Sequence, residues 1–140
     1  MLTPRDQDAV RKEFEKLAGP VKLIVFSQEL NAAELCRQNE MLVREVAELS
    51  DRLSVEALNL AIDRERAAAY GVDQVPAIVV EGARDYGLRF FGIPSGYEFS
   101  NLIDAIIVAS SGEPALSEAT KTSLAALDAD VEIKVFSTPT

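Results

Sequence analysis

Cys36 is the side chain in this sequence whose chemistry could most directly carry a reaction. It is the only cysteine among 140 residues, and the sequence contains no histidine. A lone thiol is either a reactive nucleophile in its thiolate form, open to glutathionylation, or a small buried hydrophobe within a helix. One cysteine forms no internal disulfide, and the absence of histidine excludes a Ser-His-Asp triad and the ordinary zinc site of His and Cys ligands. Both interpretations of Cys36 stay open at this point.

Composition and charge narrow the possible partners. Fourteen basic residues against 23 acidic ones give a net charge of −9, which repels the phosphate backbone of nucleic acid. No apolar run approaches the ~20 residues that span a bilayer, and residues 1–19 are too charged for a secretory signal. We therefore expect a cytoplasmic protein with no nucleic-acid or membrane partner, no metal and no cofactor.

Alternating helical and extended patterns predict the elements that position Cys36. A first helix begins at Pro4 behind the capping residue Thr3, and it is expected to end at Gly19-Pro20. Residues 21–26 are β-branched and almost continuously apolar, which is typical of a central strand covered on both faces. Asn31 can cap a second helix that carries Cys36 near its start. The expected buried face of that helix consists of Leu35, Leu42, Val46 and Leu49.

The rest of the pattern completes an α/β fold. Further strands are predicted over 54–60, 75–80 and 85–91, and a short helix from Asp63 to Tyr70 is expected to end at Gly71. Ser95 and Glu98 have the spacing of a capping box for the next helix. Helices between strands predict parallel pairing, and the last hairpin adds an antiparallel edge. The expected architecture is a sandwich with a mixed four-stranded sheet.

A helix and a strand occur twice at one offset. Helix residues Ala9, Phe14 and Leu17 and the strand at 21–27 recur 110 positions later, with the second strand expected over 131–136. A fixed offset over two elements indicates a duplicated unit. We therefore expect one complete unit over residues 1–115, and the opening helix and strand of a second, truncated unit over 116–140.

Several motifs together resemble one known family, and they lie at residues 25–29, 35–39, 70–77, 85–99 and 135–140. The family is the glutaredoxin-like protein disulfide oxidoreductases, which consist of two fused thioredoxin units. The resemblance covers nearly the whole chain, and its most specific part runs from Tyr70 to Phe99. It implies a thioredoxin/glutaredoxin-like three-layer sandwich.

The resemblance also implies roles for individual residues. Each unit of the family usually has Cys-X-X-Cys at the start of its second helix, where the first thiol attacks a disulfide and the second resolves the intermediate. The matching tetrad is Ala33-Glu34-Leu35-Cys36. Ala33 therefore replaces the nucleophile, and Cys36 matches the resolving position. Pro76 matches a cis-proline, and the preceding Val75 would offer backbone hydrogen bonds to an extended substrate peptide.

Three functional hypotheses follow. The first is a degenerate unit that acts as a scaffold or peptide-binding module for a redox-active second unit, with disulfide-containing or extended peptides as clients. The alternative is a thiol-disulfide oxidoreductase that uses Cys36 as a lone thiol in monothiol or glutathione-linked exchange, so enzyme activity is uncertain. A third hypothesis makes the segment 116–140 an assembly element that forms a homodimer, because an unpaired apolar strand needs a partner.

Overall fold

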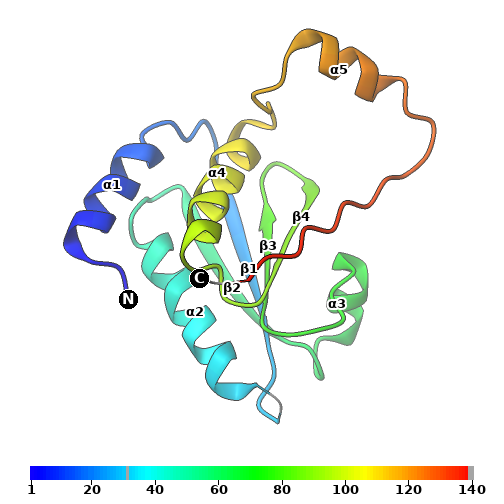
Figure 1. Cartoon of the computed structure of the whole chain (residues 1–140). Coiled ribbons are helices and arrows are strands. Elements are labelled where there is room, and N and C mark those ends of the chain that lie inside the picture. The colour runs from blue at the N-terminus through cyan, green and yellow to red at the C-terminus, as the bar shows by residue number, and fades with distance from the viewer. Residues whose placement is uncertain (31, 139–140) are drawn as a thin grey trace.

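The computed structural model describes residues 1–30 and 32–138. Its centre is a four-stranded mixed sheet with strand order β2-β1-β3-β4, flanked by helices (Figure 1). The predicted α/β architecture with a mixed four-stranded sheet is confirmed. No described helix combines the length and apolar character needed to cross a membrane. The elements are α1 (Pro4–Phe14), β1 (Val21–Ser27), α2 (Ala33–Ala47), β2 (Leu53–Asn59), α3 (Arg64–Tyr70), β3 (Ala77–Glu81), β4 (Asp85–Phe91), α4 (Tyr97–Ser111) and α5 (Glu118–Ala125).

Strand β1 lies in the middle of the sheet, as its apolar sequence predicts. It pairs in parallel with β2 from Val21↔Leu53 to Ser27↔Asn59, and it pairs with β3 on its other side. Residues 23–26 have no solvent exposure. Both backbone edges and both faces of β1 are therefore covered, by β2 and β3 at its edges and by helices α1–α4 on its faces.

One prediction about the sheet is wrong. Strand β3 runs antiparallel to β1, with Phe26 opposite Ala77, although a helix separates β3 from β2. The seven residues of α3 rise only ~10 Å, whereas the seven residues of β2 extend over ~23 Å. The chain therefore stays near the end of the sheet where β2 finishes, and β3 starts there. The β3–β4 hairpin is antiparallel as predicted.

The sheet separates two apolar clusters. On one face, α1, α2 and α4 pack against Val21, Leu23 and Val25 of β1 together with two residues of β3. On the other face, α3 covers Ile24 and Phe26 through Ala67. This alternation along one strand produces the three layers that the resemblance implies.

The helix ends agree with the sequence in part. Thr3 and Asp6 form a reciprocal capping box in front of Pro4, but α1 ends at Phe14, well before Gly19. The predicted capping box of α4 is wrong, because Gly96 occupies the N-cap position and no side chain caps the helix. The backbone N–H of Glu98 instead bonds the carbonyl of Ser95 at 3.2 Å. The predicted cap Asn31 lies outside the described residues.

The C-terminal segment has the expected helix and lacks the expected strand. Helix α5 begins behind Ser117, whose hydroxyl accepts from the backbone of Thr120. Residues 131–136 form no strand, so that expectation is wrong for this chain. A strand requires a neighbouring backbone to bond with, and β1–β4 pair only among themselves in the described part of the chain.

Glycine is required where α4 crosses the end of β3. A Cβ atom on Gly82 would lie 1.9 Å from the carbonyl oxygen of Ala109 in α4, so the two backbones touch. We expect Gly82→Ala to lower the free energy of unfolding by about 2–3 kcal/mol, measured by urea denaturation. Gly71→Ala is the matched control, because Gly71 has a φ of 65° with open space around it and should cost only about 1 kcal/mol. Equal losses for the two variants would contradict this account of the contact.

Candidate functional site

The predicted site residues lie in two segments that meet the same end of the sheet. Strand β1 finishes at Ser27, and the chain enters α2 at Ala33. Strand β3 begins at Ala77, which pairs with Phe26 near the end of β1. Val75 and Pro76 directly precede Ala77, so the strand register places them near the end of β1 from which α2 departs. The structure thus gathers all four predicted residues at one end of the sheet, whereas their chemical roles stay predictions.

Helix α2 begins without a nucleophile at its first position. Its N-cap residue Ala32 has a left-handed backbone (φ 53°, ψ 29°) and provides no side-chain cap. Ala33, the first helical residue, presents only a methyl group. The single thiol of the chain, at Cys36, lies one helical turn after Ala33. The backbone N–H of Cys36 donates to the carbonyl of Ala32 at 2.9 Å. A thiol at that position belongs to the helix face that packs inward.

Cys36 belongs to the buried face of α2. Its exposed fraction is 2%, and it heads a buried stripe, whereas the neighbouring Leu35 is 49% exposed. The predicted face, which included Leu35, is therefore shifted by one residue at its start. A buried thiol in apolar surroundings behaves as a small hydrophobe. The members of the stripe are Cys36, Asn39, Leu42, Val43 and Val46.

Asn39 is a polar member of this stripe that sequence analysis missed. It is fully buried, and neither amide atom of its side chain has a hydrogen-bond partner among the described residues. An amide buried without partners destabilises a fold, because it loses its bonds to water. Its position three residues after Cys36 was the available signal, since that spacing places both on one helix face.

The Val75–Pro76 peptide bond is cis, as the resemblance implies. The carbonyl of Pro76 accepts from the N–H of Gly92 at 2.8 Å, which ties this turn to the end of β4. Over residues 1–30 and 32–138, neither the N–H nor the C=O of Val75 has a hydrogen-bond partner. Both backbone groups of Val75 are thus left unpaired by the described residues.

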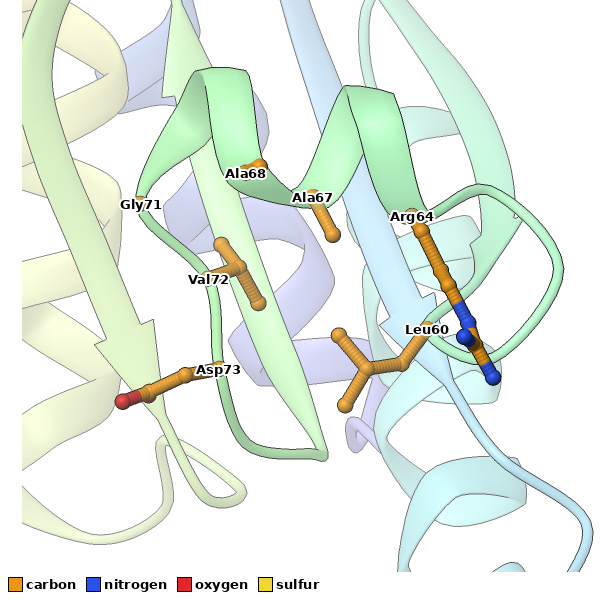
Figure 2. Close-up of a pocket in the computed structure, with 7 residues that line it drawn as sticks. All are labelled: Leu60, Arg64, Ala67, Ala68, Gly71, Val72 and Asp73. Carbon is orange, nitrogen blue, oxygen red and sulfur yellow. The ribbon is translucent and has the colours of Figure 1, made fainter.

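A pocket lies beside the segment that leads to Val75. It has a volume of about 480 Å³ and is formed between α3, Leu60 and residues 71–73. Figure 2 shows the side chains of Leu60, Ala67 and Val72 directed toward one another, with Arg64 and Asp73 at opposite ends. The floor of the pocket is therefore apolar. Arg64 gives one end a positive charge, and Asp73 gives the other end a negative charge.

A polar cluster fixes α3 to the β3–β4 hairpin and so holds the segment before Val75. The Tyr70 hydroxyl donates to Glu81 at 2.8 Å, and Nε of Arg89 donates to the Tyr70 carbonyl at 2.8 Å. Burial, followed by the bond to Glu81, raises the pKa of Tyr70. The guanidinium of Arg89 also bonds both carboxylate oxygens of Asp85 and holds the pKa of that carboxyl below its usual range. Sequence analysis could not pair these residues, because their separations of 11 and 19 positions carry no local periodicity.

Comparison with known proteins identifies the fold. No protein-family profile matches the chain. A probable thioredoxin of Methanothermobacter thermautotrophicus is 39% identical over 57 residues, which is 41% of this chain and 62% of that relative. This chain therefore matches less than two thirds of that relative's length.

Solved structures extend the similarity to most of the chain. The alkylhydroperoxide reductase AhpF of Enterococcus faecalis superposes with a TM-score of 0.81 at 23% identity, over 90% of this chain and 61% of that one. The fold is thioredoxin-like. A protein disulfide oxidoreductase from Aeropyrum pernix superposes with a TM-score of 0.78 at 24% identity, over 91% of this chain and 56% of that one. At these identities the superpositions establish the fold of this thioredoxin-like domain and leave its activity open.

The burial of Asn39 leads to a prediction about stability. Replacing this amide by an apolar side chain of similar size removes two unpaired polar atoms from the core. We expect Asn39→Leu to raise the free energy of unfolding by about 1–3 kcal/mol, measured by urea denaturation.

The control for this variant lies on the same helix. Gln38 is half-buried and bonds Glu34 at 3.1 Å, so Gln38→Leu should change stability by less than about 0.5 kcal/mol. A loss of stability in Asn39→Leu would mean that the amide has a polar partner in solution.

Proposed function

We propose that this chain is a degenerate thioredoxin-fold unit that binds extended peptides and supports a redox-active second unit. Residues 1–115 form the unit, and residues 116–140 are the opening of the second one, in which α5 is the first helix. The protein works as a scaffold and does not itself catalyse dithiol exchange. One observation carries this proposal. The tetrad has a methyl group at Ala33, its first position, and a buried thiol at Cys36, its last position.

Dithiol exchange needs two sulfur atoms within reach of each other. A first thiolate attacks the substrate disulfide and forms a mixed disulfide, releasing one substrate thiolate. The second thiolate then attacks the protein sulfur of that bond and releases the other, which leaves a protein disulfide and a reduced substrate. Ala33 provides no sulfur for the first step. The second step then has no mixed disulfide at residue 33 to resolve.

The burial of Cys36 argues against the lone-thiol alternative. Attack on a disulfide requires an accessible thiolate. A side chain with 2% exposure does not offer its sulfur to a protein or to glutathione. A buried Cys36 instead contributes to the packing of α2, which favours the scaffold function.

Peptide binding is proposed at Val75. An extended chain laid antiparallel to this residue would accept from its N–H and donate to its C=O, as in other cases of strand addition. The neighbouring pocket between α3 and residues 71–73 has an apolar floor that suits one side chain of such a peptide. Recognition of this kind uses backbone bonds, so it does not depend on a thiol.

The second unit is proposed from the repeat and from the length of similar proteins. The 110-residue offset relates the start of this chain to residues 119–137. The similar chains from Enterococcus faecalis and Aeropyrum pernix extend beyond the matched region, which covers 61% and 56% of them. Both carry names of redox proteins, which supports a redox-active neighbour for this unit.

Restoring the missing sulfur tests the proposal. We expect the wild-type chain not to accelerate the reduction of insulin disulfides by dithiothreitol. The Ala33→Cys variant should accelerate this reduction ~10-fold or more over the wild type, because it places a second thiol at the positive end of α2. Turbidity from the released insulin B chain measures the rate.

The double variant Ala33→Cys/Cys36→Ser is the matched control, since it has one thiol at the helix start and no resolving thiol. Without dithiothreitol, it should form mixed disulfides with insulin that no second protein thiol resolves. Activity in the wild-type chain would contradict the scaffold function, and rapid alkylation of Cys36 in the folded protein would then favour the lone-thiol alternative. An inactive Ala33→Cys variant would contradict the placement of Ala33 at the attacking position.

A further inference from the structure

The pocket beside the segment that leads to Val75 is open because α3 presents only small residues to it. Ala67, Ala68 and Gly71 line it on the helix side, and a Cβ atom on Gly71 would meet no heavy atom within 4 Å. Leu60 and Val72 add apolar surface. An apolar side chain from a bound chain would therefore have carbon atoms to pack against on several sides.

The two charges at the ends of this pocket have no partner of opposite sign in residues 1–30 and 32–138. Neither Arg64 nor Asp73 forms an ion pair there, whereas the neighbouring Arg66 bonds Glu56 at 2.9 Å. Nε of Arg64 donates to the carbonyl of Ala61 at 3.0 Å, which positions the guanidinium at its end of the pocket. Both ends can therefore pair with charges on a bound chain.

The direction of a bound chain decides which charge meets which end. A chain that bonds Val75 antiparallel runs toward lower residue numbers of this protein as it proceeds from its own N-terminus to its C-terminus. Asp73 lies two residues before Val75, so the two are within ~7 Å along the backbone. Arg64 lies at the opposite end of the pocket from Asp73 (Figure 2). The bound chain therefore passes Asp73 first and Arg64 last.

We propose that the extended peptides bound at Val75 carry a basic, an apolar and an acidic residue in that order. The apolar side chain fills the pocket, the basic one pairs with Asp73, and the acidic one pairs with Arg64. This inference rests on the proposed peptide binding at Val75, and it adds the class of peptide that is preferred. One exposed ion pair changes an affinity only about threefold. The preference therefore comes from two such pairs around one buried side chain, since the reverse order would place like charges together at both ends.

Two peptides of identical composition test the order of the charges. Both are acetylated and amidated with Gly and Ser at each end, and the centre reads Thr-Val-Lys-Leu-Glu in one and Thr-Val-Glu-Leu-Lys in the other. We expect the Lys-Leu-Glu peptide to bind about tenfold more tightly, measured from the shift of the Val75 amide in ¹⁵N NMR titrations. Replacing its Leu by Ala should weaken binding about tenfold, because the pocket is then left empty.

Variants of the protein test the same contacts. The double variant Arg64→Glu/Asp73→Lys should reverse the preference, so that the Glu-Leu-Lys peptide binds more tightly. Ala68→Leu fills the pocket and should weaken binding of the Lys-Leu-Glu peptide about tenfold. Ala69→Leu is the matched control, because Ala69 is the next residue of α3, is also exposed and does not line the pocket. Thermal unfolding of each variant checks that the domain stays folded.

The outcomes separate this inference from the proposed function. If both isomers shift the Val75 amide and bind equally, the order of charges is overturned and peptide binding at Val75 stands. If neither isomer nor S-carboxymethylated insulin B chain shifts the Val75 amide, both are overturned. Equal weakening by Ala68→Leu and Ala69→Leu would overturn the placement of the apolar side chain in the pocket.

Discussion

The burial of β1 is the constraint on which the rest of the structure depends. Leu23 and Val25 point into the core beneath α1, α2 and α4, while Ile24 and Phe26 point into the core beneath α3. A strand with both faces and both edges covered has one register available, since a shift by one residue would exchange its two faces. The end of this strand then fixes where α2 starts and where β3 begins.

Under the proposed function, that constraint explains how the site keeps its geometry without the attacking thiol. The positions of Ala33, Cys36 and Val75 follow from the ends of β1 and β3, and none of these positions requires a sulfur atom. The Tyr70–Arg89 contact holds the segment before Val75 on the face of the sheet that α3 covers. The fold therefore tolerates a methyl group at residue 33 at little structural cost. In the proposed function, the unpaired backbone of Val75 is the part of the site that binds.

The sequence predicted those elements whose signals are local. Three predicted features agree with the structure. They are the strand from the apolar run at 21–26, the left-handed Gly71 and the strand at 85–91. Two predictions failed because the deciding partner is distant in sequence, whereas the failed capping box of Ser95 and Glu98 is a local signal. The direction of β3 depends on how far α3 carries the chain, and a strand at 131–136 depends on a neighbour that the described sheet does not provide.

The candidate site also contains both predicted and unpredicted features. The tetrad 33–36 and the Val75–Pro76 turn were predicted from a resemblance, and the structure brings them to one end of the sheet. The burial of the Asn39 amide was not predicted, because asparagine side chains on a surface helix usually face solvent. The Tyr70–Arg89–Asp85 contacts were not predicted either, since only the folded hairpin places them together.

The measurement that tests the central claim most directly is an NMR titration of the ¹⁵N-labelled chain with S-carboxymethylated insulin B chain. This probe is an unfolded peptide without a reactive sulfur, so it reports on backbone recognition alone. Our account predicts saturable shifts of the Val75 amide and its neighbours, with slowed hydrogen exchange at Val75 and no change at Cys36 in the core. Shifts confined to other surfaces, or none at Val75, would contradict it.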